Sequence, residues 1–182
     1  MQMMREVRVR LEPVVSEEYP QFRRDIQEAF SVAVVEEFGD QGGEPIPSDA
    51  ELNAAFAAPG ALVFHVVSGD VRVGGVVVEI HPETQRNSLV FFFVSPAFHS
   101  CGFGLAAWRE VERMFPGTVV WETVTPYFEK RNVHFYVNKC GFAAVEFFNR
   151  FHPDPAMPPM RGDGKPVPGS DEFFRFEKRM KG

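Results

Sequence analysis

The segment 93–108, "FVSPAFHSCGFGLAAW", has the residue types and spacing of an anion-binding loop. An apolar strand runs into Pro96, and Gly102 and Gly104 then open a run with helical periodicity. A helix N-terminus exposes backbone N–H groups, and glycines let a phosphate approach the backbone closely. A tight turn would need the same two glycines. The segment alone therefore leaves a phosphate-binding loop and a structural corner as alternatives.

The segment also matches the dinucleotide-binding pattern G-x-G-x-x-A, with Glu122 about where a ribose-binding acid would lie. The spacing argues against this interpretation. Seven residues, "SPAFHSC", separate Val94 from Gly102, whereas the glycines of that motif follow the strand directly. The N-terminal half also predicts a hairpin rather than repeated βαβ units, so we reject a nicotinamide cofactor at this loop.

The elements before the loop are predicted from periodicity and from turn residues. Alternation of charge and valine predicts a strand over 5–15, and apolar periodicity predicts a helix over 19–38. Ser48 and Glu51 form a capping-box pattern at the start of a short helix. Gly69-Asp70 is a two-residue hairpin signal between two β-rich runs.

From the loop onward, strand and helix patterns continue to alternate. We predict a strand over 88–94, a helix over 105–115, a strand over 118–124, a helix over 128–140, and strands over 142–151 and 172–180. The order is β-α-α-β-β-β-α-β-α-β-β. It predicts a single α/β (α+β) domain over residues 1–182, with a mixed, mostly antiparallel central sheet of about seven strands and helices on both faces.

Composition excludes several classes of function. The formal net charge is −6 and Lys and Arg are scattered, which argues against a nucleic-acid-binding surface. We expect a cytoplasmic protein with no membrane segment, because no apolar run has the length of a signal peptide core or a membrane helix. Cys101 and Cys140 lie far apart and the five histidines are dispersed, so we expect no metal site.

Two motifs resemble those of the GNAT superfamily of acyl-CoA N-acyltransferases. The family's acetyl-CoA loop reads Gln/Arg-x-x-Gly-x-Gly/Ala, which here corresponds to His99 through Gly104, with His99 in place of the usual Gln or Arg. The later "RNVHFYVNKCGF" resembles the second signature, in which a helix carrying Asn132 and Tyr136 precedes Gly-Phe and a strand. Tyr136 lies one residue further from that Gly-Phe pair than is common in the family. Asn132 lies closer to Tyr136 than the family's Asn usually lies to its Tyr. The element order resembles the acyl-CoA N-acyltransferase fold over nearly the whole chain.

The resemblance implies that acetyl-CoA is the cosubstrate. Its pantetheine arm would pair with backbone groups of the strand before the loop, and the loop amides would hold its pyrophosphate. The cofactor-binding residues implied in this way are Phe92, Phe93, Val94, His99, Ser100, Cys101, Gly102, Phe103, Gly104, Leu105 and Asn132.

In such enzymes the amine attacks directly, which leaves two proton transfers to the protein. The resemblance makes Tyr136 the general acid, although a packed core aromatic is the alternative. We prefer Glu122 as general base, because desolvation inside the apolar "VVWETV" would favour proton uptake. A structural ion pair with an arginine is an equal alternative for Glu122. Glu79, His81 and a water chain are other candidates for the base.

The predicted function is transfer of an acetyl group from acetyl-CoA to a primary amine of a small molecule. The alternative is a non-catalytic CoA-binding or ligand-sensing module of the same fold. The first two helices and the long Pro/Gly loop after His152 are expected to select the amine. The family often forms dimers through edge strands, and the C-terminal strand over 172–180 could serve in a homodimer.

Overall fold

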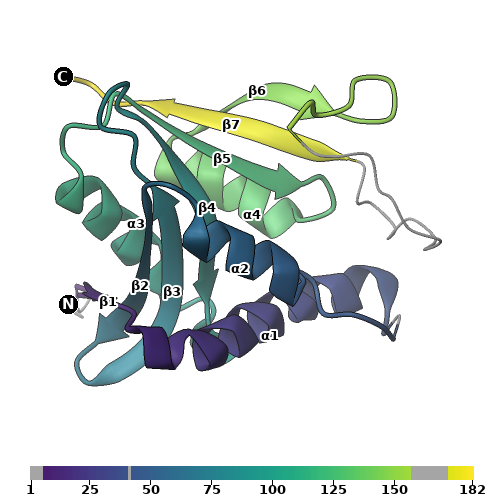
Figure 1. Cartoon of the computed structure of the whole chain (residues 1–182), viewed down its shortest axis with the longest axis horizontal. Helices are drawn as coiled ribbons and strands as arrows, with labels where there is room; N and C mark the ends of the chain where they lie inside the picture. Colours follow the sequence, from purple (N-terminus) through teal and green to yellow (C-terminus); the bar gives the residue numbers. More distant parts are fainter. Residues whose placement is uncertain (1–5, 41, 157–171) are drawn as a thin grey trace, which may run out of the picture. The chain divides into compact units, whose positions relative to one another are not determined.

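The computed structural model describes residues 6–40, 42–156 and 172–182, which form two compact units. The first unit ends at Thr118 and the second begins at Val119. The elements of the first unit are β1 (Arg10–Pro13), η1 (Ser16–Glu18), α1 (Tyr19–Phe38), α2 (Asp49–Ala57), β2 (Ala61–Ser68), β3 (Val71–Glu79), β4 (Arg86–Val94), η2 (Pro96–Phe98) and α3 (Phe103–Met114). Those of the second are β5 (Val120–Pro126), α4 (Lys130–His134), η3 (Phe135–Cys140), β6 (Ala143–Phe148) and β7 (Phe173–Arg179) (Figure 1).

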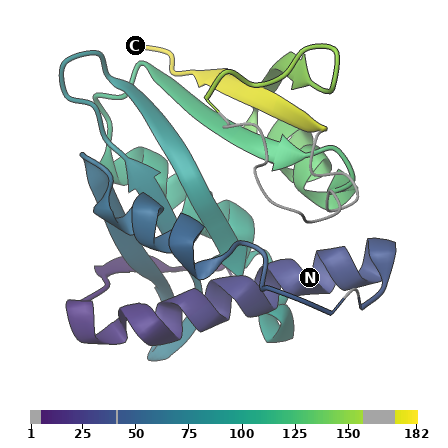
Figure 2. The same cartoon turned by 45° about the vertical axis from the view of Figure 1, so that its right-hand side comes forward.

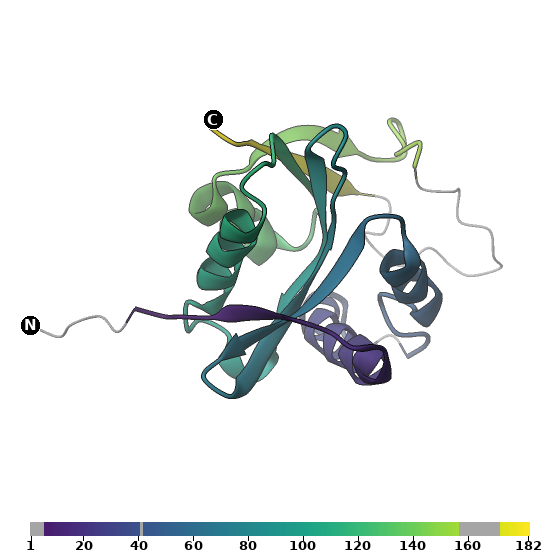
Figure 3. The same cartoon turned by 60° about the vertical axis from the view of Figure 1, so that its left-hand side comes forward.

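The strand pairings in each unit are antiparallel. The strand order is β1-β2-β3-β4 in the first unit and β5-β7-β6 in the second. In the first unit α1 and α2 cover one face of the strands and α3 covers the other (Figure 3). The predicted α/β class, with seven mostly antiparallel strands and helices on both faces, is confirmed. That the whole chain forms one domain stays a prediction.

Two local predictions in the first unit are confirmed. The Ser48 hydroxyl accepts a hydrogen bond from the backbone N–H of Glu51, whose carboxylate accepts from the Ser48 N–H, which completes the capping box of α2. Gly69 has φ 59° in the turn that joins β2 to β3. A positive φ at this position is what a two-residue hairpin turn requires, so the glycine sets this connection.

Two predictions in the second unit need correction. The C-terminal strand β7 pairs with β5 on one side and β6 on the other, so it is not an edge strand that could form a dimer; Figures 1 and 2 show β7 in yellow between the two. The helix predicted over 128–140 is a short α4 followed by the π-helical η3. The segment is helical from Lys130 to Cys140, with Tyr136 and Cys140 buried and Val137 exposed.

A charged network joins the start of α1 to β2 and β3. The Glu18 carboxylate pairs with the Arg72 guanidinium and lies 3.0 Å from Nε2 of His65, whose ring is buried. The hydrogen bonds from Arg72 and then His65 lower the pKa of Glu18 from 4.5 to about 2. Since the folded protein holds this carboxylate ionised more readily than the unfolded chain does, Glu18 stabilises the fold above about pH 4.5. That contribution is lost as the pH falls towards 2.

None of the helices in the described ranges is long and apolar enough to cross a membrane.

We expect Glu18→Gln to lower the melting temperature at neutral pH, because Arg72 and the buried His65 lose their carboxylate partner. The difference from wild type should shrink as the pH falls from 4.5 towards 2, where Glu18 of the wild type is itself protonated. Thermal melts across this range measure the effect, with the exposed neighbour Glu17→Gln as the control. A difference that does not change with pH would contradict the role of this carboxylate.

Candidate functional site

Strand β4 is irregular before it reaches the loop. Val77 of β3 lies opposite Phe91, but the next residue, Val78, lies opposite Leu89. Val90 is therefore an extra residue in β4, which is the arrangement of a β-bulge. A bulge increases the twist of its strand and redirects the residues that follow.

The backbone of residues 92–94 alternates in direction beyond this bulge. The Phe93 carbonyl oxygen lies 2.2 Å from the position that a Cβ on Gly74 would occupy, so this carbonyl is turned towards β3. Backbone groups of successive residues in an antiparallel strand point to opposite sides. Those of Phe92 and Val94 therefore point away from β3. Of the three residues predicted to pair with a pantetheine arm, these two present their backbone groups on the side that β3 does not use.

The loop that follows β4 is attached to the ends of two strands. The Ser95 N–H donates to the Val73 carbonyl at 2.8 Å, and η2 forms the first turn of the loop. Nε2 of His99 lies 2.8 Å from the Val94 carbonyl, and it carries the proton in this bond because a carbonyl can only accept. His99 thus holds the loop against β4. Its predicted contact with a cofactor stays a prediction.

The end of the loop has the backbone conformation of an anion site. Ser100 has φ 62° and Gly102 has φ 83°, both in the left-handed region. Gly102 is the N-cap of α3 and has no side chain to satisfy the N–H groups of the first helical turn. A Cβ on Gly102 would meet only a Val7 methyl at 3.5 Å, so the positive φ rather than crowding favours glycine here. Left-handed conformation at a residue such as Ser100 is uncommon and occurs often at ligand sites.

The other predicted loop residues continue this segment. Cys101 is exposed, and its thiol lies 3.4 Å from the His99 carbonyl. Phe103 packs edge-to-face on Phe98, with ring centroids 5.9 Å apart, and Gly104 and Leu105 complete the first turn of α3. The predicted cofactor residues of the first unit thus form one continuous strand–loop–helix segment. The open N-terminus of a twelve-residue helix fits a pyrophosphate.

In the second unit Tyr136 is buried among aromatic rings. Its ring lies 5.5 Å from that of Phe142 and 6.0 Å from that of Phe176, and its hydroxyl shares a hydrogen bond with Thr123. Burial raises the pKa of Tyr136, and Cys140 raises it further. The phenol is therefore protonated at neutral pH. It can donate a proton, and it is also well packed, so both interpretations of Tyr136 fit these contacts. Asn132 lies one turn earlier, on α4, and is half buried.

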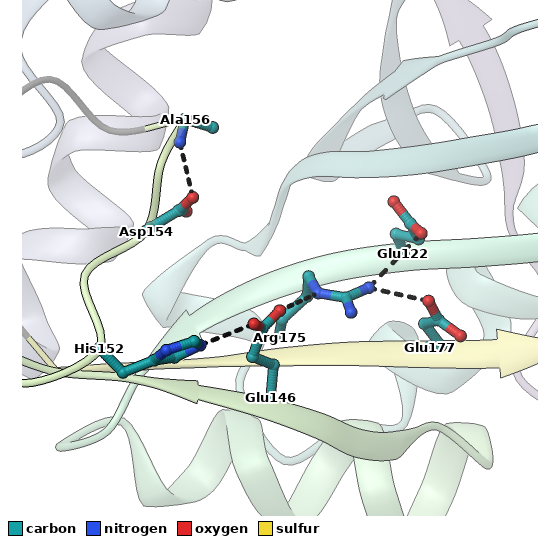
Figure 4. A network of polar contacts seen from close by, with 7 residues as sticks. All are labelled: Glu122, Glu146, His152, Asp154, Ala156, Arg175 and Glu177. Atoms are coloured by element: carbon teal, nitrogen blue, oxygen red, sulfur yellow. Dashed lines mark hydrogen bonds and ion pairs between the residues drawn. The ribbon is translucent and has the colours of Figure 1, made fainter.

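Glu122 belongs to a network centred on Arg175 (Figure 4). Its Oε1 lies 3.6 Å from Nη1 of Arg175, and the same guanidinium lies 3.0 Å from Glu146 and 2.8 Å from Glu177. The side chain of Glu122 is 29% exposed, so the burial on which its predicted role depends is only partial. His152 lies 2.8 Å from Glu146, and its hydrogen bond, followed by that of Arg175, lowers the pKa of Glu146.

The two predicted catalytic side chains lie on opposite faces of β5. Tyr136 contacts Thr123 and Phe176, which are cross-strand partners, whereas Glu122 lies on the Arg175 face. Neighbouring residues in a strand point to opposite faces. The other candidate bases, Glu79 and His81, lie in the first unit with Oε2 and Nε2 3.7 Å apart. The second unit therefore does not bring Tyr136 and Glu122 together.

The sequence interpretation missed two features of these units. Arg175 is separated from Glu122 and Glu146 in sequence, and only the pairing of β7 with β5 and β6 brings them together. Gly74-Gly75 could have been noticed, because glycines inside a strand often mark a close approach of two backbones. Within the described ranges, no group of three or more His, Cys, Asp or Glu could hold a metal ion.

The chain matches known proteins in sequence and in fold. Residues 19–142 match the family model described as the acetyltransferase (GNAT) family. The protein YrkN of Bacillus subtilis (strain 168) is 52% identical over 177 residues, which are 97% of this chain and 96% of that protein. An acetyltransferase from Thermus thermophilus has the same fold with a TM-score of 0.67 at 16% identity, over 97% of this chain and 100% of that one. A Bacillus subtilis acetyltransferase in complex with CoA gives a TM-score of 0.59 at 16% identity, over 97% and 100% of the two chains.

We expect Gly102→Ala to weaken CoA binding at least about tenfold, because a left-handed residue with a Cβ costs roughly 1–2 kcal/mol and the first turn of α3 would shift to relieve it. Isothermal titration with CoA measures the loss. Gly69→Ala is the matched control, since Gly69 has a similar positive φ in the hairpin turn between β2 and β3. Both variants should lose stability, but only the first should lose affinity. Equal CoA affinities would contradict the assignment of this loop.

Proposed function

Because the chain belongs to the GNAT acetyltransferase family, we propose that it transfers the acetyl group of acetyl-CoA to a primary amine of a small molecule by direct attack. Acetyl-CoA is the cosubstrate, and it supplies an activated thioester. The observation that carries the proposal is the open N-terminus of α3, where Gly102 provides a left-handed N-cap without a side chain. The family match includes this loop.

The residues proposed to hold acetyl-CoA act mainly through their backbones. First-turn N–H groups of α3 and the N–H groups of the exposed loop before it would bind the pyrophosphate. Backbone groups of Phe92 and the N–H of Val94 would pair with the pantetheine arm, since they point away from β3 and the Val94 carbonyl accepts from His99. A backbone site of this kind tolerates His99 where the family has Gln or Arg, because the imidazole is used inside the loop.

Tyr136 is the proposed general acid for the departing thiolate. Its support is the family position of this phenol and a raised pKa, which keeps the proton on the hydroxyl at neutral pH. Glu122 is the proposed general base, and its support is a partly exposed carboxylate on β5. Both groups would have to reach the same reacting thioester, so their positions on opposite faces of β5 count against a joint role and make the two assignments separate hypotheses. A structural ion pair with Arg175 is the competing role for Glu122.

A small cationic amine is the proposed acceptor. The chain has a formal net charge of −6, and Glu36, Glu37 and Asp40 are exposed at the end of α1. Negative potential raises the local concentration of a cationic substrate. Neither Cys101 nor Cys140 forms a disulfide in the described structure, which suits the cytoplasm as the proposed location. The loop expected to select the amine lies largely in residues 157–171, outside the described residues. A homodimer also stays a proposal.

The test is an acetylation assay with acetyl-CoA and a panel of polyamines, amino acids and aminoglycosides, read by thiol release and product mass. Turnover of at least one amine is the expected result. A melting-temperature rise with CoA but not NAD, without turnover of any amine, would favour the non-catalytic CoA-binding module. No response to any CoA species would contradict both functions.

Tyr136→Phe should lower kcat by about 10²- to 10⁴-fold, because it removes the proton donor and leaves the ring. The CoA affinity should stay within about twofold of wild type, since the proposed binding groups are backbone atoms of another segment. Steady-state kinetics and CoA titration measure the two effects. Phe135→Leu, which alters a ring packed on Tyr136 at 5.4 Å, controls for packing. An unchanged kcat in Tyr136→Phe would remove this phenol from the reaction.

Glu122→Gln should abolish the acid limb of the pH profile of kcat/KM, because the amide cannot take up the proton of the amine. Glu146→Gln is the matched control, since it removes a carboxylate from the same guanidinium. That variant should keep the acid limb and lose only stability. If the two variants have the same pH profile, Glu122 serves the ion pair with Arg175 rather than the chemistry.

A further inference from the structure

Two adjacent glycines interrupt β3 where the strand is buried. Gly74 and Gly75 are followed by Val76, Val77 and Val78, none of which has any exposed surface. Neither glycine has a positive φ, so conformational freedom does not explain them. A side chain at either position would instead collide with atoms of the neighbouring elements.

At Gly74 the collision is with the backbone of β4. A Cβ there would lie 2.2 Å from the Phe93 carbonyl oxygen and 3.1 Å from the Val94 Cα, whereas real Cβ contacts below 3.0 Å essentially never occur. Backbone atoms cannot rotate away as the end of a side chain can. The absence of a Cβ at Gly74 therefore allows the Phe93 carbonyl to lie against β3.

At Gly75 the space is filled by two phenylalanine rings. A Cβ there would lie 2.4 Å from Cε2 of Phe22 and 2.6 Å from Cε1 of Phe93. Gly75 is opposite Phe93 on one side and His65 on the other, and the buried Phe22 ring of α1 lies in this row. Its centroid is 5.6 Å from that of Phe93 and 5.5 Å from that of His65. Phe93 is thus held by its carbonyl and by its ring.

We propose that the Gly74-Gly75 step of β3 positions the backbone of Phe92 and Val94 for the pantetheine arm of CoA. The inference rests on the proposed function, and it assigns a role in binding to residues that do not touch the ligand. When Phe93 is fixed against β3, the groups of its two neighbours are fixed on the opposite side of β4. The hydrogen bonds from Ser95 to Val73 and from His99 to Val94 then fix the position of the loop relative to the end of β4.

The test is Gly74→Ala, with CoA and 3′-phospho-ADP, which is CoA without its pantetheine arm, as the two probes. Relief of the 2.2 Å contact must move the Phe93 carbonyl by most of an ångström, which is enough to break a backbone hydrogen bond made by its neighbours in β4. We expect CoA affinity to fall at least about tenfold and 3′-phospho-ADP affinity to change less than about twofold. Gly117→Ala is the matched control, because its Cβ would meet only the Gln85 side chain at 3.6 Å.

A spectroscopic measurement reports the geometry directly, also if Gly74→Ala proves too unstable. Phe93-Val94 is the only Phe-Val step in the chain, so carbonyl-labelled Phe with nitrogen-labelled Val gives one amide resonance, that of Val94. In the wild type this resonance should shift with CoA and stay in place with 3′-phospho-ADP. In Gly74→Ala it should be displaced before any ligand is added.

Several outcomes would overturn the inference. One is a Val94 resonance in the wild type that does not shift when CoA binds. Another is an equal loss of affinity for CoA and 3′-phospho-ADP in Gly74→Ala. A third is a CoA affinity in Gly74→Ala that equals that of the wild type. If the wild type binds neither probe, the proposed function itself fails, and this result is distinct because it is seen without any substitution.

Discussion

The close approach of β4 to β3 is the constraint on which the candidate cofactor site depends. The Phe93 carbonyl occupies the place where any residue other than glycine would put a Cβ, and this contact fixes the end of β4. From there the loop is attached through Ser95 and His99, and it reaches α3 at a left-handed Gly102. These contacts connect the end of β4 to the N-terminus of α3. The position of the loop therefore depends on how β4 packs against β3.

Arg175 is the centre of a group of carboxylates in the second unit. Arg175 lies within 4 Å of Glu122, Glu146 and Glu177. Tyr136 is in the opposite situation, in an aromatic core where burial keeps its hydroxyl protonated. Strand β5 therefore has one half-exposed face with an ion pair and one buried aromatic face. The roles proposed for Glu122 and Tyr136 therefore have to be tested one at a time.

Much of the fold could be predicted because local rules decide it. The capping box of Ser48 and Glu51 and the Gly69 hairpin turn depend on neighbours in sequence, and both are present as predicted. Where the structure departs from the prediction, contacts between distant segments decide the arrangement. Insertion of β7 between β5 and β6 makes the C-terminal strand internal.

For the site, the sequence by itself determined the strand, the loop, the glycines and the helix start, because residues 92–105 form one continuous segment whose conformation follows from local backbone chemistry. Only the tertiary structure decided how those residues are held. The approach of Phe93 to Gly74 and the pairing of Glu122 with Arg175 join positions whose distance depends on strand register and packing. Residue type and spacing determine which local conformation a segment can adopt. Its partners across a sheet depend on how the whole chain folds.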